Sequence, residues 1–135
     1  MGIGWRIQCS SSMEFIKGSF ASQCQDVNSY RAELLGIYAL LVILHTTIKL
    51  HSPQHPSGIL YCDNESAIKL ISSLTFHIHP QRKHSDVLHD IRHVKQMLSC
   101  NLRFHHIRGH QDKNRHLMEL SLPAKLNCRC DSLAK

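Results

Sequence analysis

The sequence lacks the features that mark exported, membrane-spanning and disulfide-stabilised proteins. Its N-terminus has no charged leader followed by an apolar core, so we expect no secretory signal. Its most apolar stretch, Leu34–Leu44, is much shorter than the roughly 20 residues that cross a bilayer. Its six cysteines include no CxxC pair. We therefore expect reduced thiols in a soluble intracellular protein, either cytoplasmic or nuclear, with no membrane partner.

The chain also lacks the excess of charge and the low hydrophobicity of disordered proteins. Charged residues make up 19% of the sequence and hydrophobic residues 42%, which is typical of a globular chain. A length of 135 residues predicts one domain, spanning 1–135. The net charge of +6 favours a polyanionic partner such as nucleic acid, although a basic excess alone is a weak signal.

The N-terminal part predicts a β-hairpin followed by a helix. Residues Gly4–Cys9 and Met13–Cys24 have the composition of two strands joined by a short polar turn, with Gly18 as a candidate bulge. Asn28 or Ser29 can cap the helix that follows, which ends at a segment with two prolines and a glycine.

The rest of the chain alternates strands and helices. A short, continuously apolar run predicts a strand buried on both faces, and a polar, basic segment leads to a third helix that Ser85 can cap. The predicted elements are strand Ile59–Cys62, helix Glu65–Leu74, a helix from Ser85 to Leu98, strand Leu102–Ile107 and helix Leu122–Lys135. This order predicts an α/β fold, a mixed sheet with helices packed on its faces.

Three acids lie at informative positions on three different elements. Glu33 falls on the apolar face of the first helix, Asp63 ends the buried strand, and Asp131 lies on the last helix. Singly, they are explained as a first-turn acid, a helix cap and an exposed helix acid. Together they can meet at the carboxyl end of one strand, where α/β sheets form ligand crevices. Oxygen-only clusters suit Mg²⁺ or Mn²⁺, and two such ions can hydrolyse a phosphodiester.

Four segments that include these acids resemble, in the same order, the motifs of one family. That family is the type 1 ribonuclease H domain found at the end of reverse transcriptases in retroelements. The likeness covers essentially the whole chain. The matching segments are Tyr30–Gly36, Tyr61–Ala67, Ile107–Asp112 and Asn127–Ala134.

The resemblance implies a ribonuclease H-like fold, a five-stranded mixed sheet with helices on both faces. It also implies hydrolysis of the RNA strand of an RNA–DNA hybrid by two magnesium ions. By motif match, Glu33, Asp63 and Asp131 become metal ligands. His110 becomes the loop residue that assists proton transfer or product departure, with a solvated loop histidine as the alternative. Asn127 would shape the site through hydrogen bonds.

The sequence departs from the family at its start. The family begins with a strand that carries the first catalytic aspartate, before the segment that Gly2–Trp5 matches, and this chain starts after that strand. Asp26 falls in the wrong connection to replace it. We expect the missing strand to be the central one, and its loss to leave the hairpin and the strand at 59–62 with unpaired edges.

The densest basic region is a candidate nucleic-acid surface. Arg82 and Lys83 lie before the third helix, and Arg92 and Lys95 lie on it. Given the family likeness, we expect these side chains to contact the phosphate backbone of the hybrid, with a solvated helix face as the alternative. Asn64 is a further candidate contact.

Three functions remain open on the sequence alone. The first is a hybrid-specific ribonuclease, whose parent protein would also hold a reverse transcriptase polymerase domain. The second is a non-catalytic nucleic-acid-binding remnant of that domain, and the third is an integrase- or transposase-like DNA nuclease of the same fold. A structural zinc site is not favoured, because His89, His93, Cys128 and Cys130 do not form a recognisable set of four ligands.

Overall fold

The α/β class expected from the sequence is confirmed by a computed structural model that describes residues 2–12, 14–21, 28–73, 78–113 and 115–134. Four α-helices and four β-strands are present in these ranges, together with two short 3₁₀ turns. The elements are β1 (Gly2–Gln8), β2 (Phe15–Ala21), α1 (Ser29–His51), β3 (Ser57–Cys62), α2 (Glu65–Ser72), α3 (Ser85–Met97), β4 (Asn101–His106), η1 (Gln111–Lys113), η2 (Leu117–Glu119) and α4 (Leu122–Leu133).

The strands form two pairs. β1 and β2 are antiparallel, in an unbroken register from Gly2↔Ala21 to Gln8↔Phe15. The expected bulge at Gly18 is therefore wrong: Gly18 pairs regularly with Trp5, whose indole ring lies over it and leaves no room for a Cβ. β3 and β4 are parallel, as the continuously apolar run predicts. The expected burial of β3 on both faces is wrong, because Leu60 and Cys62 are buried but Ile59, on the other face, is exposed.

The prediction of one mixed sheet needs correction, because the described strands form two separate two-stranded sheets. Among the described residues, β1 pairs only with β2, and β3 only with β4. Each of β1 and β3 thus has an edge without a strand partner in this part of the chain. Unpaired edges were expected from the sequence at these two places, on the hairpin and on the strand at 59–62.

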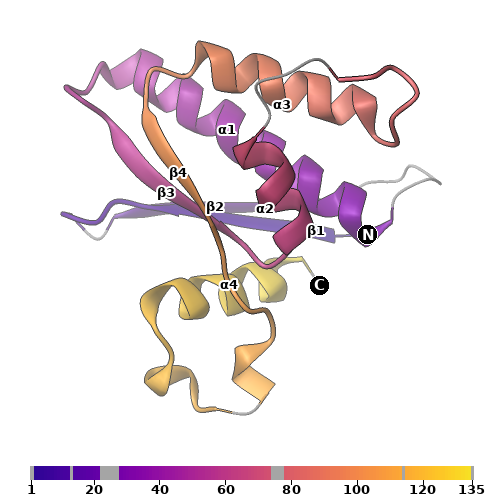
Figure 1. Ribbon diagram of the computed structural model, residues 1–135. Coiled ribbons are helices and arrows are strands. Elements are labelled where there is room, and N and C mark those ends of the chain that lie inside the picture. Colours follow the sequence, from indigo (N-terminus) through magenta and orange to yellow (C-terminus); the bar gives the residue numbers. More distant parts are fainter. Residues whose placement is uncertain (1, 13, 22–27, 74–77, 114, 135) are drawn as a thin grey trace.

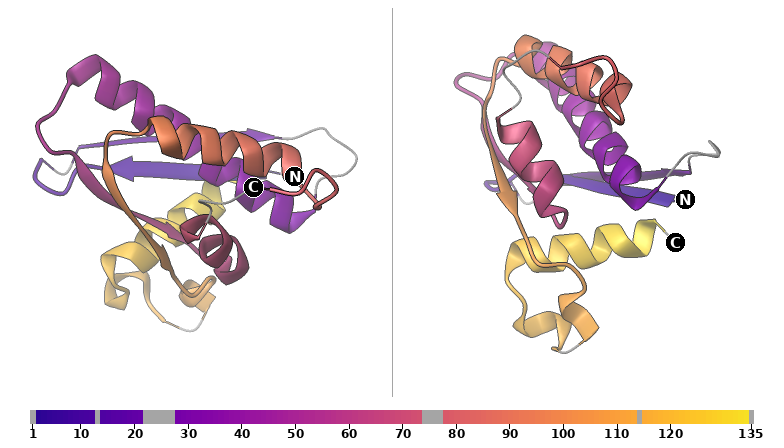
Figure 2. Two further views of the ribbon diagram at one scale, coloured as in Figure 1. Left: turned by 45° about the horizontal axis from the view of Figure 1, so that its top comes forward. Right: turned by 45° about the vertical axis from the view of Figure 1, so that its right-hand side comes forward.

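The elements lie in layers, with α1 and α3 on one side of the strands and α4 on the other (Figures 1 and 2). α1 packs on β1 and α3, while α4 packs on β1 and β3. The main core lies between α1, α2, α3 and the β3–β4 pair. Its fully buried large side chains are Leu34, Leu41, Ile71, Ile78, Leu88 and Ile91.

Helix α1 begins where the sequence predicts. The side chain of Asn28 accepts a hydrogen bond of 2.8 Å from the backbone N–H of Arg31, which caps the first turn. The helix has 23 residues, so by length and composition it could span a membrane, which the 11-residue stretch noted in the sequence did not suggest. Core helices of soluble proteins pass the same test, and Leu34, Ile37 and Leu41 of α1 are buried in the core.

The cap of α3 differs from the prediction. His84 occupies the cap position in a left-handed conformation with φ of 63°, and its side chain makes no capping hydrogen bond. Ser85 is instead the first helical residue, and its hydroxyl donates to the carbonyl of Pro80. Tertiary contact fixes this end of the helix, because Arg31 of α1 forms a two-pronged ion pair with Asp86.

The predicted boundaries elsewhere shift by a few residues. Helix α2 ends at Ser72, and the remaining predicted position, Leu74, lies outside the described residues. The ends of the predicted second strand, at Met13 and Cys24, also lie outside them, as does Lys135 of the last helix.

A close backbone approach holds α4 against β1. A Cβ placed on Gly4 would overlap the carbonyl oxygen of Cys130, and one on Gly2 would overlap that of Ala134. The two glycines therefore let the helix lie directly on the strand. This contact positions α4, which carries two of the candidate residues selected from the sequence, Asn127 and Asp131.

Replacing Gly4 by alanine should push α4 away from β1. We expect Gly4→Ala to lower the free energy of unfolding by about 1–3 kcal/mol, since an added methyl group in a packed site forces the backbone to move. Chemical denaturation measures this change. Gly58→Ala is the control, because the nearest atom to its new Cβ would be Leu102 Cδ1 at 3.4 Å. Equal loss of stability in the two variants would contradict the close approach at Gly4.

Candidate metal centre

Glu33 is carried inward by the second turn of α1. Its neighbours Ala32 and Leu34 are buried, and Glu33 itself is half-buried. A carboxylate in such a position loses hydration, which is costly unless a partner or a cation compensates. Burial raises the pKa of Glu33, and the charge of Asp63 raises it further, as does that of Asp131.

Asp63 follows the last residue of β3 and is not used as a helix cap. That task falls to Asn64, whose Oδ1 accepts a hydrogen bond of 3.0 Å from the N–H of Ala67. The carboxylate of Asp63 accepts a 3.4 Å hydrogen bond from the amide of Asn127 on α4. The backbone carbonyl of Asp63 also lies 3.2 Å from Nε2 of His106. Asp63 is thus oriented by contacts from β4 and α4.

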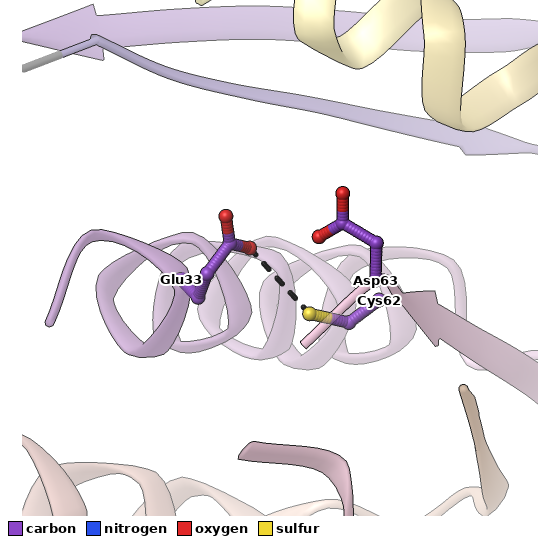
Figure 3. A group of neighbouring side chains, drawn as sticks. All are labelled: Glu33, Cys62 and Asp63. Carbon is purple, nitrogen blue, oxygen red and sulfur yellow. Dashed lines mark hydrogen bonds between the residues drawn. The ribbon is translucent and has the colours of Figure 1, made fainter. Parts of the chain in front are cut away.

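Glu33 and Asp63 meet, together with a cysteine that the sequence analysis did not select. One ligand atom from each of Glu33, Cys62 and Asp63 lies within 4.8 Å of the other two. The Cys62 thiol donates a hydrogen bond to Oε2 of Glu33, with a sulfur–oxygen distance of 3.5 Å. Both carboxylates point toward the side on which the β1–β2 hairpin and α4 lie (Figure 3).

Cys62 was missed because a cysteine at the end of an apolar strand has the pattern of a buried core thiol. It is indeed buried. Burial raises the pKa of its thiol to about 12, so in the absence of a metal it is protonated and acts as a hydrogen-bond donor. The one available signal was its place directly before Asp63.

The last helix brings Asp131 close to the other acids without joining the 4.8 Å group. Asp131 is half-buried, and its negative charge contributes to the raised pKa of Glu33. Its Oδ2 lies 3.5 Å from Nδ1 of His110, so the two form an ion pair when the histidine is protonated. Cys130 sits beside Asp131, and burial raises the pKa of its thiol to about 11.

The loop after β4 closes one side of the site. A Cβ on Gly109 would lie 2.6 Å from Oδ2 of Asp63, so only glycine lets this loop pass so near the carboxylate. His110 follows in a left-handed conformation with φ of 51° and is exposed. An open pocket of about 420 Å³ lies here. It is lined by Ser29, Glu33, Asp63, Asn64, Glu65, Ser66, Gly109 and His110.

The structure separates the four basic candidates. Arg82 and Lys83 are exposed. Burial raises the pKa of Tyr30, three residues before Glu33 in α1, and the positive charge of Arg82 partly opposes this rise. Arg92 is half-buried. Lys95 points inward: its ammonium donates a 2.5 Å hydrogen bond to the carbonyl of Ile71 and lies 5.0 Å from the ring centre of Phe104. Burial accordingly lowers the pKa of Lys95. Of the four, only Arg82 and Lys83 are exposed.

Comparison of the chain with protein-family models, with curated proteins and with solved structures finds no match. The chemistry of the site therefore has to be argued from its own residues. Two half-buried carboxylates within 4.8 Å, with a third nearby, make a donor set that fits divalent cations with oxygen ligands. Two unit charges 4 Å apart repel by about 4 kcal/mol at an effective dielectric constant of about 20, and a bound cation removes that repulsion.

The raised pKa of Glu33 predicts that replacing this carboxylate by a neutral side chain stabilises the folded state at neutral pH. A carboxyl whose pKa is higher in the folded state opposes folding once the pH rises above its unfolded value, about 4.3. In metal-free buffer we expect Glu33→Gln to melt at a higher temperature than the unsubstituted chain at pH 7. The difference should disappear below about pH 4, where both states bind the proton.

Glu65→Gln is the matched control for this measurement. Glu65 is exposed at the rim of the same pocket, and its pKa is lowered by a hydrogen bond from Lys69. Its neutralisation should therefore give no stabilisation at pH 7. A Glu33→Gln variant that melts below the unsubstituted chain at pH 7 would contradict the electrostatic account.

Proposed function

We propose that this chain is a ribonuclease H-like domain that hydrolyses the RNA strand of RNA–DNA hybrids with two Mg²⁺ or Mn²⁺ ions. The observation that carries the proposal is convergence. Glu33, Asp63, His110 and Asp131 come from the four motif segments that resemble the family, and they all lie around one site. Bringing half-buried acids from distant segments together costs desolvation and repulsion, and a bound cation would offset that cost.

Under this proposal each of the converging residues has a separate role. Glu33, Asp63 and Asp131 would hold the metal ions. When bound, the ions would supply an activated water and stabilise the leaving oxygen of the phosphodiester. Asn127 positions Asp63 through its amide hydrogen bond. His110 is exposed on a loop beside Asp131, where an imidazole can move a proton between the site and solvent.

The exposed basic pair supports a polyanionic substrate. Arg82 and Lys83 precede α3, whose first turn is tied to the start of α1 by the ion pair between Arg31 and Asp86. This places the basic loop at the same end of α1 as Glu33. Cations there would bind the phosphate backbone while the carboxylates face the scissile bond.

A non-catalytic, nucleic-acid-binding domain is the second candidate. It is favoured by the separation of the two sheets, since β1 and β3 are not joined by hydrogen bonds in the described part of the chain. In this reading the basic loop still binds nucleic acid, but the acids are not held rigidly enough for hydrolysis.

Substitution of Asp63 tests the catalytic proposal. With purified chain, labelled RNA–DNA hybrid and Mg²⁺, we expect cleavage of the RNA strand and a loss of at least about 100-fold in rate for Asp63→Asn, since a metal ligand is removed. Glu65→Gln should keep the rate, because Glu65 is exposed at the pocket rim and paired with Lys69.

Two further arms separate the alternatives. A chain extended at its N-terminus by a strand that carries an aspartate, as the family resemblance predicts, is assayed in parallel. Cleavage by the extended form alone would favour the binding domain for this chain, and cleavage by neither form would contradict the nuclease proposal. Cleavage of duplex DNA but not of the hybrid would favour an integrase-like nuclease.

The basic loop predicts how binding depends on salt. The affinity for a polyanion falls as salt rises, and each phosphate contact that is lost should make the slope of log affinity against log salt shallower by roughly 0.9. We expect the double variant Arg82→Ala, Lys83→Ala to bind the hybrid more weakly and with a slope reduced by roughly 1–2. Lys49→Ala is the control, since this exposed lysine lies near the opposite end of α1. An unchanged slope in the double variant would remove the loop from the binding surface.

A further inference from the structure

The cluster around Glu33 contains a donor that magnesium does not use. Hard cations such as Mg²⁺ take oxygen ligands, whereas thiolate sulfur selects softer ions such as Zn²⁺. Cys62 places its sulfur within 4.8 Å of carboxylate oxygens from both Glu33 and Asp63. The three donors come from α1, from the last residue of β3, and from the residue after it. The site therefore mixes two carboxylates with one thiol.

The distances already approach those of a zinc site. With Zn–O near 2.1 Å and Zn–S near 2.3 Å, two ligands on a tetrahedral ion lie about 3.4–3.6 Å apart. The sulfur of Cys62 is 3.5 Å from Oε2 of Glu33. The remaining separations are at most 4.8 Å, so a shift of roughly 1 Å in the side chains of Glu33 and Asp63 brings all three donors around one ion.

An ion held by these three residues would keep a fourth coordination position open to the pocket. Glu33 and Asp63 both line the open pocket of about 420 Å³, which gives a water molecule access to an ion they hold. Three protein ligands and one water is the arrangement of open zinc sites, in contrast to the closed four-ligand sites that the sequence does not provide.

Cys62 is buried, but its thiol is not surrounded by apolar groups alone. The thiol of Cys62 is instead directed at a carboxylate, as the dashed line in Figure 3 shows. The backbone N–H of Asn64, two residues later, also points at this sulfur, with a nitrogen–sulfur distance of 3.4 Å. An N–H directed at sulfur stabilises the negative charge that a bound thiolate carries.

The geometry points to a site for one thiophilic divalent cation, Zn²⁺, bound by Glu33, Cys62 and Asp63. On binding, the sulfur–hydrogen bond of Cys62 breaks, the sulfur keeps the electron pair and bonds the metal, and the proton passes to solvent. The site does not require nuclease activity. Occupation by Zn²⁺ would take Glu33 and Asp63 from Mg²⁺, a consequence that does rest on the proposed function.

Cadmium titration tests the site directly, because a cadmium–thiolate bond absorbs ultraviolet light and a cadmium–carboxylate bond does not. In reducing, chelator-free buffer we expect one equivalent of Cd²⁺ to produce this absorption band. Excess Zn²⁺ should abolish the band, and excess Mg²⁺ should leave it. The Cys62→Ser variant should lack the band. Cys9→Ser and Cys100→Ser should keep it, since neither cysteine belongs to the cluster.

A second variant keeps the test decisive if Cys62→Ser does not fold. Glu33→Gln retains the thiol but loses one carboxylate, so it should bind Cd²⁺ at least about 10-fold more weakly while remaining folded by circular dichroism. Absence of the band in the unsubstituted chain would overturn the inference. So would persistence of the band in folded Cys62→Ser, which would assign the thiolate to another cysteine such as Cys130.

Discussion

The repulsion between the carboxylates of Glu33 and Asp63 is the constraint around which the rest of the molecule is arranged. Both acids are half-buried and their ligand atoms lie within 4.8 Å, so burial and like charge act together to raise the pKa of Glu33. A fold selected for stability alone would place apolar residues there. The surrounding elements hold the acids in place, and under the proposed function a bound cation would neutralise them.

Three structural devices bring the acids together. The cap at Asn28 starts α1 so that Glu33 faces β3. Asn64 caps α2 and so leaves Asp63 free to point into the site. Gly2 and Gly4 of β1 have no side chains, so α4 lies close enough to the strand for Asn127 to reach Asp63. The two caps are local in sequence, whereas the contact of β1 with α4 joins the first strand to the last helix, and the site forms only when all three are in place.

Local signals explain what the sequence could predict, and long-range contacts explain what it could not. The cap at Asn28 and the parallel strand β3 depend on residues close in sequence, and they were predicted. Helix α3 begins at Ser85, but the predicted cap was wrong: His84 holds the cap position, at an end of the helix that contacts α1 through the ion pair of Asp86 with Arg31, 55 residues earlier. The separation of the hairpin from β3 was expected from the family resemblance and not from any local pattern. Cys62 was missed because its hydrogen bond to a carboxylate on another element leaves no trace in the sequence.

Binding of Mn²⁺, followed through the electron paramagnetic resonance signal of the free ion, tests the central claim most directly. If carboxylates from α1, β3 and α4 share a metal site, Glu33→Gln, Asp63→Asn and Asp131→Asn should each weaken binding by at least about 10-fold. Glu65→Gln, at the exposed rim, should not. Equal binding by the Asp131→Asn variant and the unsubstituted chain, or an equal loss in Glu65→Gln, would contradict a shared site.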